Sequence, residues 1–151
     1  MLDIEAIRRR LPHRYPFLMI DRVLEREEGR VVALKNVTIN EPFFQGHFPD
    51  PHEAVMPGVL IIEAMAQTSA FLTMEAEDDG AAPRVGYLVG VDKVRVRRKV
   101  IPGDQLRLEA EHVRSKRGLV QAQVRATVDG ELAASALISF VLAEGEPEEP
   151  R

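Results

Sequence analysis

The sequence contains no cysteine and no tryptophan, and aromatic residues make up only 5% of its 151 residues. Without cysteine there is no disulfide, no thiolate nucleophile and no cysteine-ligated zinc site, and a reducing compartment is compatible with this composition. The scarcity of aromatic residues leaves Val, Leu, Ile, Ala and a few Phe residues to form the core.

Long apolar runs and a net positive charge are also missing. The longest apolar stretch, Val59–Ile62 continuing past Glu63 to Ala66, is too short and too interrupted to span a bilayer. The N-terminus has no apolar signal core. The formal charge of −4 argues against nucleic acid as a partner. We therefore expect a cytoplasmic protein that binds neither membranes nor nucleic acid.

The apolar pattern predicts one domain over residues 1–142 and a polar, disordered tail over residues 143–151. Apolar and small residues occupy nearly every face of the run from Val59 to about Glu75, which predicts a helix surrounded by protein. We expect a short helix over Asp3–Arg10 and strands over Phe17–Leu24, Val31–Ile39, Val85–Val91 continuing into Asp92–Val96, Leu106–Val113, Val120–Val128 and Leu132–Leu142. The predicted class is α+β, with an antiparallel sheet of five or six strands wrapped around one long central helix.

Of the four histidines, His47 has the most distinctive context. Gly46-His47-Phe48-Pro49 places an imidazole between a flexible backbone position and an apolar wall, shortly before the long helix. Taken alone, His47 fits a structural role and a general base equally well. For the other three we expect structural or solvent-exposed roles: His13, His52 and His112.

Glu63 lies in the long helix, and all of its close sequence neighbours are apolar. Because burying an ionised carboxylate is costly, desolvation there favours a protonated acid that can donate its proton near neutral pH. The alternative is a structural hydrogen bond to a facing loop. Gln67, one turn further along, can hold the Glu63 side chain in either case.

Pro57-Gly58 opens this helix, where the first amide N–H groups lack helical partners and carry the positive end of the helix dipole. Gly58 lets a substrate carbonyl approach closely, so its N–H is a candidate oxyanion donor, although the pair also suits plain helix initiation. A base, an acid and an amide donor suit proton abstraction α to a thioester carbonyl with acid-assisted loss of a β-hydroxyl. The histidines and carboxylates lack metal-ligand spacing, and the sequence has no phosphate loop, dinucleotide glycine pattern or serine nucleophile elbow.

Four motifs stand out: Leu11-Pro-His-Arg-Tyr-Pro-Phe-Leu18, Asn40-Glu-Pro-Phe-Phe-Gln-Gly-His-Phe-Pro49, Met56-Pro-Gly-Val-Leu-Ile-Ile-Glu-Ala-Met-Ala-Gln67 and Pro102-Gly-Asp-Gln-Leu106. They resemble the FabZ-type (3R)-hydroxyacyl-[acyl-carrier-protein] dehydratases, from about Leu11 to Leu142. The second and third motifs together are highly specific. The resemblance implies a hot-dog fold and cofactor-free dehydration of (3R)-3-hydroxyacyl-[acyl-carrier-protein] to the trans-2-enoyl product in fatty acid biosynthesis. Glutamate rather than aspartate at position 63 favours dehydration without isomerisation.

The resemblance also implies a homodimer, and a trimer of such dimers, in which the motif histidine and the helix glutamate come from opposite subunits. These residues are His47 and Glu63, with Gly58 polarising the thioester carbonyl and Gln67 in support. The implied tunnel and gate residues are Tyr15, Phe48 and Val96. The implied partner is an acidic acyl carrier protein with a phosphopantetheine-linked acyl chain. The basic residues implied to bind it are Lys93, Arg95, Arg97, Arg98 and Lys99.

Two features depart from the family pattern. The segment Asp50–Ala54 lacks the usual glycine and lengthens the link between the two motifs by about two residues. Val96 stands where many relatives carry an aromatic gate, so acyl chain length is not implied. Two other functions stay open: a hot-dog acyl thioesterase that activates water in the same pocket, and a non-catalytic subunit that binds acyl carrier protein.

Overall fold

The computed structural model describes residues 1–74 and 84–143. The described elements are α1 (Ile4–Arg10), β1 (Arg22–Glu27), β2 (Arg30–Asn36), the 3₁₀ helix η1 (Pro42–Gln45), α2 (Gly58–Ala70), β3 (Gly86–Val96), β4 (Gln105–Lys116), β5 (Leu119–Val128) and β6 (Glu131–Leu142). The expected end of the long helix near Glu75 and the expected polar tail from residue 144 on lie outside the described residues. No helix in the described ranges is long and apolar enough to cross a membrane.

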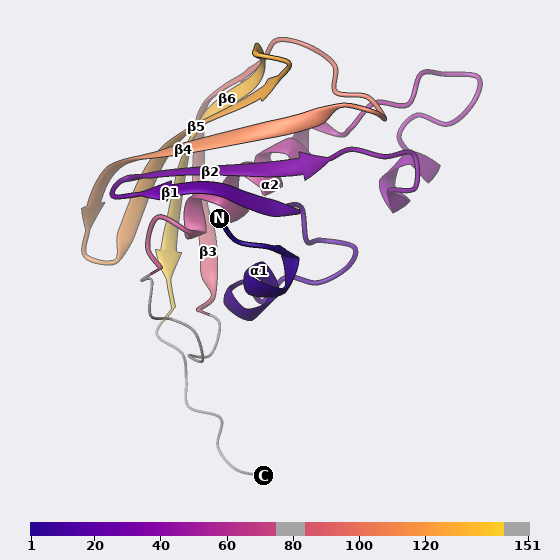
Figure 1. Ribbon diagram of the computed structural model, residues 1–151. Coiled ribbons are helices and arrows are strands. Elements are labelled where there is room, and N and C mark those ends of the chain that lie inside the picture. The colour runs from indigo at the N-terminus through magenta and orange to yellow at the C-terminus, as the bar shows by residue number, and fades with distance from the viewer. Residues whose placement is uncertain (75–83, 144–151) are drawn as a thin grey trace.

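The strands form one antiparallel sheet in the order β1-β2-β4-β5-β6-β3. The sheet curves around α2, and α1 lies beside the β1 edge (Figure 1). Along β5 the buried residues alternate with polar ones, because successive side chains of a strand point to opposite faces. The α+β class is therefore confirmed, with six strands in the described part of the chain.

One side of α2 packs against the sheet. Ala64 and Met65 are fully buried, and so are Thr68 and Ser69. The two hydroxyl groups donate to the carbonyls of Ala64 (2.8 Å) and Met65 (2.9 Å), so their burial leaves no unpaired donor. On the other side, Val59 is 73% exposed. The expectation of a helix surrounded by protein therefore holds for only one side of α2 within a single chain.

The first strand begins later than predicted from the sequence. The strand begins at Arg22 and not at Phe17. Before it, the amide of Met19 donates to the Gln67 side chain (2.8 Å) and not to a neighbouring strand. The Phe17 carbonyl and the Met19 amide are thus tied to Gln67 of α2. Only the Asp21 amide, which donates to the Leu34 carbonyl (2.8 Å), begins the bonding to β2.

The end of the long helix also differs from the expected one. α2 ends at Ala70, because the following amides bond to carbonyls three residues back, as in Phe71 to Thr68 (3.2 Å). The strand expected over Val85–Val91 and continuing into Asp92–Val96 is confirmed as the single strand β3. Its register shifts twice, and Lys93 has a φ of 51°, so bulges interrupt the alternation that a regular strand would show in sequence.

Candidate active site

His47 lies between η1 and α2, on a segment anchored at both ends. Phe44 is buried and anchors η1 in the core. The His47 amide donates to the carbonyl of Phe43 (3.0 Å), and the Met56 amide donates to the carbonyl of Val100 (2.7 Å). The residues between these two hydrogen bonds, which include the lengthened segment Asp50–Ala54, are therefore anchored to the rest of the fold at both ends.

The His47 ring is oriented by the backbone. Its Nδ1 lies 2.7 Å from the carbonyl oxygen of Val55. A carbonyl oxygen can only accept, so the proton of neutral His47 resides on Nδ1 and Nε2 keeps its lone pair. The Phe48 ring stacks on the imidazole, with ring centroids 4.0 Å apart. His47 is thereby presented as a base with Nε2 available.

Gly58 begins α2 beside His47. The amides of Leu60 and Ile61 both donate to the Pro57 carbonyl (2.9 and 3.1 Å), whereas the Gly58 amide has no partner within the described ranges. A Cβ atom at Gly58 would meet no atom within 4 Å, so packing within this chain does not require a glycine there. The pocket lined by His47, Gly58, Val96 and Arg97–Val100 is called the base pocket below.

Glu63 is held by side chains and not by the backbone. Its Oε1 accepts a hydrogen bond from Nε2 of Gln67 (2.7 Å). Gln67 is 2% exposed, and it is fixed in turn by the Phe17 carbonyl (2.6 Å) and the Met19 amide (2.8 Å). The pocket lined by Glu63, Gln67, His13, Arg84 and Leu88 is called the acid pocket below.

The Glu63 side chain is 25% exposed, so the expectation of a buried carboxylate is wrong for a single chain. Its sequence neighbours are apolar, but helical spacing turns several of them toward the core and turns Glu63 toward the acid pocket. The apolar neighbours in sequence are therefore not all its neighbours in space.

The base and acid pockets lie on different sides of α2. Gly58 and Glu63 are separated by five residues, which is about 140° of rotation and about 7.5 Å along a helix. Within residues 1–74 and 84–143, no interaction joins His47 to Glu63, and each lines its own pocket. One chain therefore presents two half-sites that face apart.

Comparison with known proteins assigns the family. A family model described as a FabA-like domain matches residues 11–137. A 3-hydroxyacyl-[acyl-carrier-protein] dehydratase FabZ from Oceanobacillus iheyensis is 51% identical over 143 residues, which cover 94% of this chain and 99% of that protein. The FabZ dehydratase of Bordetella pertussis is 57% identical over 140 residues, which cover 89% of this chain and 91% of the relative. The chain belongs to the FabZ dehydratase family.

Solved structures support the hot-dog fold. The chain is similar to a structure of the dehydratase heterocomplex ApeI:P from Xenorhabdus doucetiae, with a TM-score of 0.77, 17% identity and 91% of each chain covered. It is also similar to a hypothetical thioesterase from Streptococcus pneumoniae solved with coenzyme A, with a TM-score of 0.60, 15% identity, and 81% of this chain and 84% of that chain covered. At these identities the likeness concerns the fold alone.

The residues expected for a FabZ tunnel and gate fall in different places. Val96 lines the base pocket. Phe48 is 49% exposed and contacts His47, as described above. Tyr15 is 81% exposed and lines neither pocket. A tunnel role for Tyr15 in this FabZ family member would therefore need a surface beyond the single chain.

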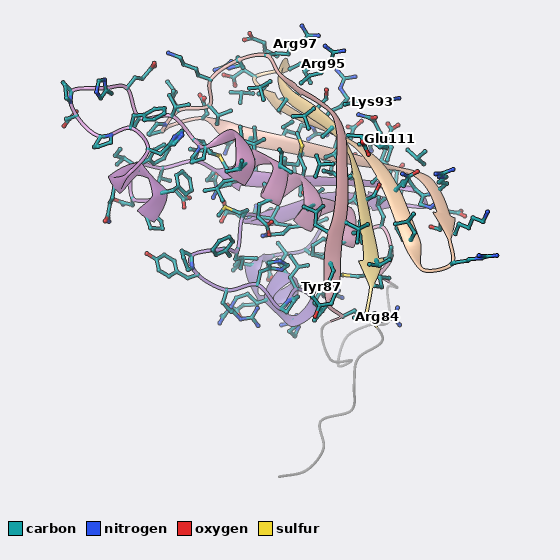
Figure 2. The ribbon with its side chains drawn as sticks, turned by 180° about the vertical axis from the view of Figure 1, so that it is seen from behind. Arg84, Tyr87, Lys93, Arg95, Arg97 and Glu111 are labelled. Atoms are coloured by element: carbon teal, nitrogen blue, oxygen red, sulfur yellow. The ribbon has the colours of Figure 1, made fainter. Side chains whose placement is uncertain are left out.

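The basic residues expected to bind a carrier protein divide into two groups. Lys93, Arg95 and Arg97 are exposed and lie toward one end of β3 (Figure 2), and no ion pair involves them among the described residues. Arg98 instead pairs with Glu131 (2.9 Å) and Asp104 (3.5 Å). Lys99 pairs with Glu53 (2.7 Å).

The structure adds His13, for which the sequence suggested only a structural role. Its Nε2 lies 3.4 Å from Oε1 of Glu63. The signal was available in the first FabZ-like motif, which includes His13, but nothing local connects that motif to the helix. The other two histidines are exposed as expected: His52 and His112. Among the described residues, no group of three or more His, Cys, Asp or Glu side chains is placed to hold a metal ion.

Proposed function

We propose that two copies of this chain dehydrate a (3R)-3-hydroxyacyl-[acyl-carrier-protein] to the trans-2-enoyl thioester, with His47 of one copy and Glu63 of the other at each active site. The observation that carries this proposal is the separation of the two half-sites on α2. A base and an acid that face apart in one chain can act on the same substrate only if a second chain supplies the missing half.

The proposed chemistry moves two protons. Nε2 of His47 takes the proton from C2 of the acyl chain, and the Gly58 N–H stabilises the negative charge that develops on the thioester oxygen. The C3–OH bond breaks as Glu63 gives its proton to the departing oxygen, which leaves as water. Passage of the proton from His47 back to Glu63 restores the enzyme. The elimination transfers no electrons to an acceptor, so it requires no redox cofactor.

The β3 edge offers a way to join the half-sites. Within the described part of the chain, β3 pairs only with β6. Its exposed apolar side chains include Tyr87, Val89 and Val94. A long, apolar, unpaired strand edge favours pairing with another chain, and a two-fold axis makes such a pair antiparallel.

Antiparallel pairing along β3 would also bring the base pocket of one chain close to the acid pocket of the other. Arg97 of the base pocket and Arg84 of the acid pocket lie toward opposite ends of β3 (Figure 2). In a two-fold pair, the Arg97 end of one strand approaches the Arg84 end of the other. This geometry supports a dimer in which each base pocket meets an acid pocket. The family resemblance implies three such dimers in the full assembly.

Charge supports an acidic carrier protein as the substrate carrier. Lys93, Arg95 and Arg97 project from the end of β3 that adjoins the base pocket (Figure 2). Exposed cations beside the entrance of a site attract an acidic partner and raise its association rate. We also propose a cytoplasmic location, since such a substrate travels on a protein carrier.

The decisive experiment combines two inactive variants, His47→Ala and Glu63→Gln, each expected to lower enoyl-thioester hydration by about a thousandfold. When the two variants are co-expressed with different tags, half of the randomly paired dimers are mixed. Each mixed dimer then has one intact active site and one that lacks both groups. About a quarter of wild-type activity should then return. No recovery in purified mixed dimers would overturn the shared site.

The same assay separates the alternative functions. Release of free thiol from acyl thioesters, without hydration of the enoyl substrate, would identify a thioesterase. Binding of acyl carrier protein without turnover would identify a non-catalytic subunit. Either result contradicts the proposed dehydration.

A further inference from the structure

His13 lies outside α2 and contacts the carboxyl group of Glu63, the proposed catalytic acid. Its Nε2 lies 3.4 Å from Oε1 of Glu63, and the two side chains are 30% and 25% exposed. The same oxygen accepts the Gln67 amide at 2.7 Å. Two nitrogen atoms therefore face Oε1, while Oε2 makes no hydrogen bond or ion pair within the described ranges.

The surroundings of the His13 ring select its tautomer. Nδ1 is buried and has no hydrogen-bond partner in the part of the chain that the structure describes. An N–H at this nitrogen would be a buried, unpaired donor, which is costly. A proton on Nε2 avoids this cost and faces Glu63.

A neutral N–H beside Oε1 has a chemical consequence. In a protonated carboxyl group the carbonyl oxygen accepts hydrogen bonds and the other oxygen carries the proton. The Gln67 hydrogen bond at Oε1, together with an N–H of His13 lying 3.4 Å from the same oxygen, thus favours Oε1 as the acceptor and leaves the proton on Oε2. An imidazolium at this distance would instead stabilise the carboxylate and oppose proton donation.

The backbone around His13 is fixed independently of its ring. The Arg14 guanidinium donates to the carbonyls of Leu11 (2.8 Å), His13 (2.7 Å) and Arg8 (2.8 Å). These bonds hold the turn between α1 and β1. Replacing the imidazole therefore changes the contact with Glu63 while the turn keeps its own anchors.

We propose that His13 is a positioning residue for Glu63, whose neutral Nε2–H joins Gln67 at Oε1 so that the acidic proton is carried on Oε2. The proposal rests on the proposed role of Glu63 as the acid. Among the described residues, Glu63 and Arg84 are the charged side chains that line the pocket with His13, so their electrostatic fields act on any residue at this position.

Two variants of similar polarity test the role of Nε2. In His13→Gln the side-chain amide nitrogen reaches the position of Nε2, whereas in His13→Asn it reaches only that of Nδ1. We expect His13→Asn to lower kcat by about tenfold, as for loss of one polar N–H contact, with little change in KM. His13→Gln should restore kcat to within about threefold of wild type. His112→Asn, at an exposed hairpin position bonded to Ser115, is the matched control.

Three readouts decide the outcome. Equal losses of kcat in both His13 variants, or a wild-type kcat in His13→Asn, would overturn the proposal. Loss of one limb of the pH–kcat profile in His13→Gln would also overturn it, because the ring would then titrate during turnover. Glu63→Gln is assayed in parallel. An active Glu63→Gln variant rejects the proposed function, whereas an inactive one with unaffected His13 variants rejects only the positioning role.

Discussion

The two half-sites on α2 are built by different means. In the base pocket, backbone groups do the positioning: the Val55 carbonyl orients His47, and the start of the helix provides the Gly58 amide. In the acid pocket, side chains do it: Gln67 holds Glu63, and His13 lies against the same oxygen. The base is thus oriented by a loop, whereas the acid depends on side chains from α2 and from the segment before β1.

The difference suits the two chemical tasks. A base needs one nitrogen with a free lone pair, and a single carbonyl on the other nitrogen achieves this. An acid must hold its proton on one particular oxygen, which requires donors at the other oxygen. We therefore expect the base pocket to tolerate substitutions that preserve its hydrogen bonds to the backbone. Loss of the reacting nitrogen, Nε2 of His47, should abolish activity.

The largest expected effect comes from changing only the reacting nitrogen of the base pocket. In His47→Asn the side-chain amide can still donate to the Val55 carbonyl, but Nε2 is gone. We expect enoyl-thioester hydration to fall by about a thousandfold with an unchanged thermal unfolding midpoint. Activity within tenfold of wild type would remove His47 from the role of base.

A smaller effect should follow from removing the amide hydrogen at the start of α2. Gly58→Pro deletes the N–H, and proline suits both the first helical position and the extended conformation of Pro57 (φ −55°, ψ 131°). Loss of one oxyanion donor should lower kcat by about a hundredfold.

Gly58→Ala keeps the N–H and adds only a Cβ, which meets no atom of this chain within 4 Å. It therefore measures how much of the loss arises from volume in the pocket. Equal kinetic losses in the alanine and proline variants would show that space, not the hydrogen bond, matters at Gly58.

The smallest effect is expected far from both pockets. Glu25 faces away from the core, and hydrogen bonds from Arg30 and then Arg107 hold the pKa of its carboxyl group below the usual value. A lowered folded-state pKa stabilises the fold above the unfolded pKa, and this contribution is lost as pH falls through the folded value. Glu25→Gln should thus lower the unfolding midpoint slightly at neutral pH.

The difference between Glu25→Gln and wild type should shrink as the pH falls below the ordinary glutamate value of 4.5. Thermal unfolding across this range measures it. Because the ion pair lies outside both half-sites, hydration activity at neutral pH should not change. A pH-independent difference in midpoint would mean that the side chain matters through packing and not through charge.

Sequence reasoning found the main elements but misjudged several limits. β5 was recognised because its alternation is uninterrupted, and β3 was correctly predicted to continue through Asp92, whereas its register shifts near Leu88 and Asp92 were not predicted. Phe17 was assigned to a strand because its apolar neighbours fit one, although its carbonyl and the Met19 amide bond to Gln67 from a distant helix. Such pairings depend on contacts nearly fifty residues apart, which local patterns do not record.

The sequence by itself determined the α+β class, the likeness to FabZ and the choice of His47, Gly58, Glu63 and Gln67. These follow from residue types, spacing and motifs, which a chain carries before it folds. Only the tertiary structure decided that His47 keeps its lone pair on Nε2, that His13 meets Glu63, and that the pockets face opposite sides of α2. Hydrogen-bond partners and facing surfaces arise when distant segments pack together, so no single motif contains them.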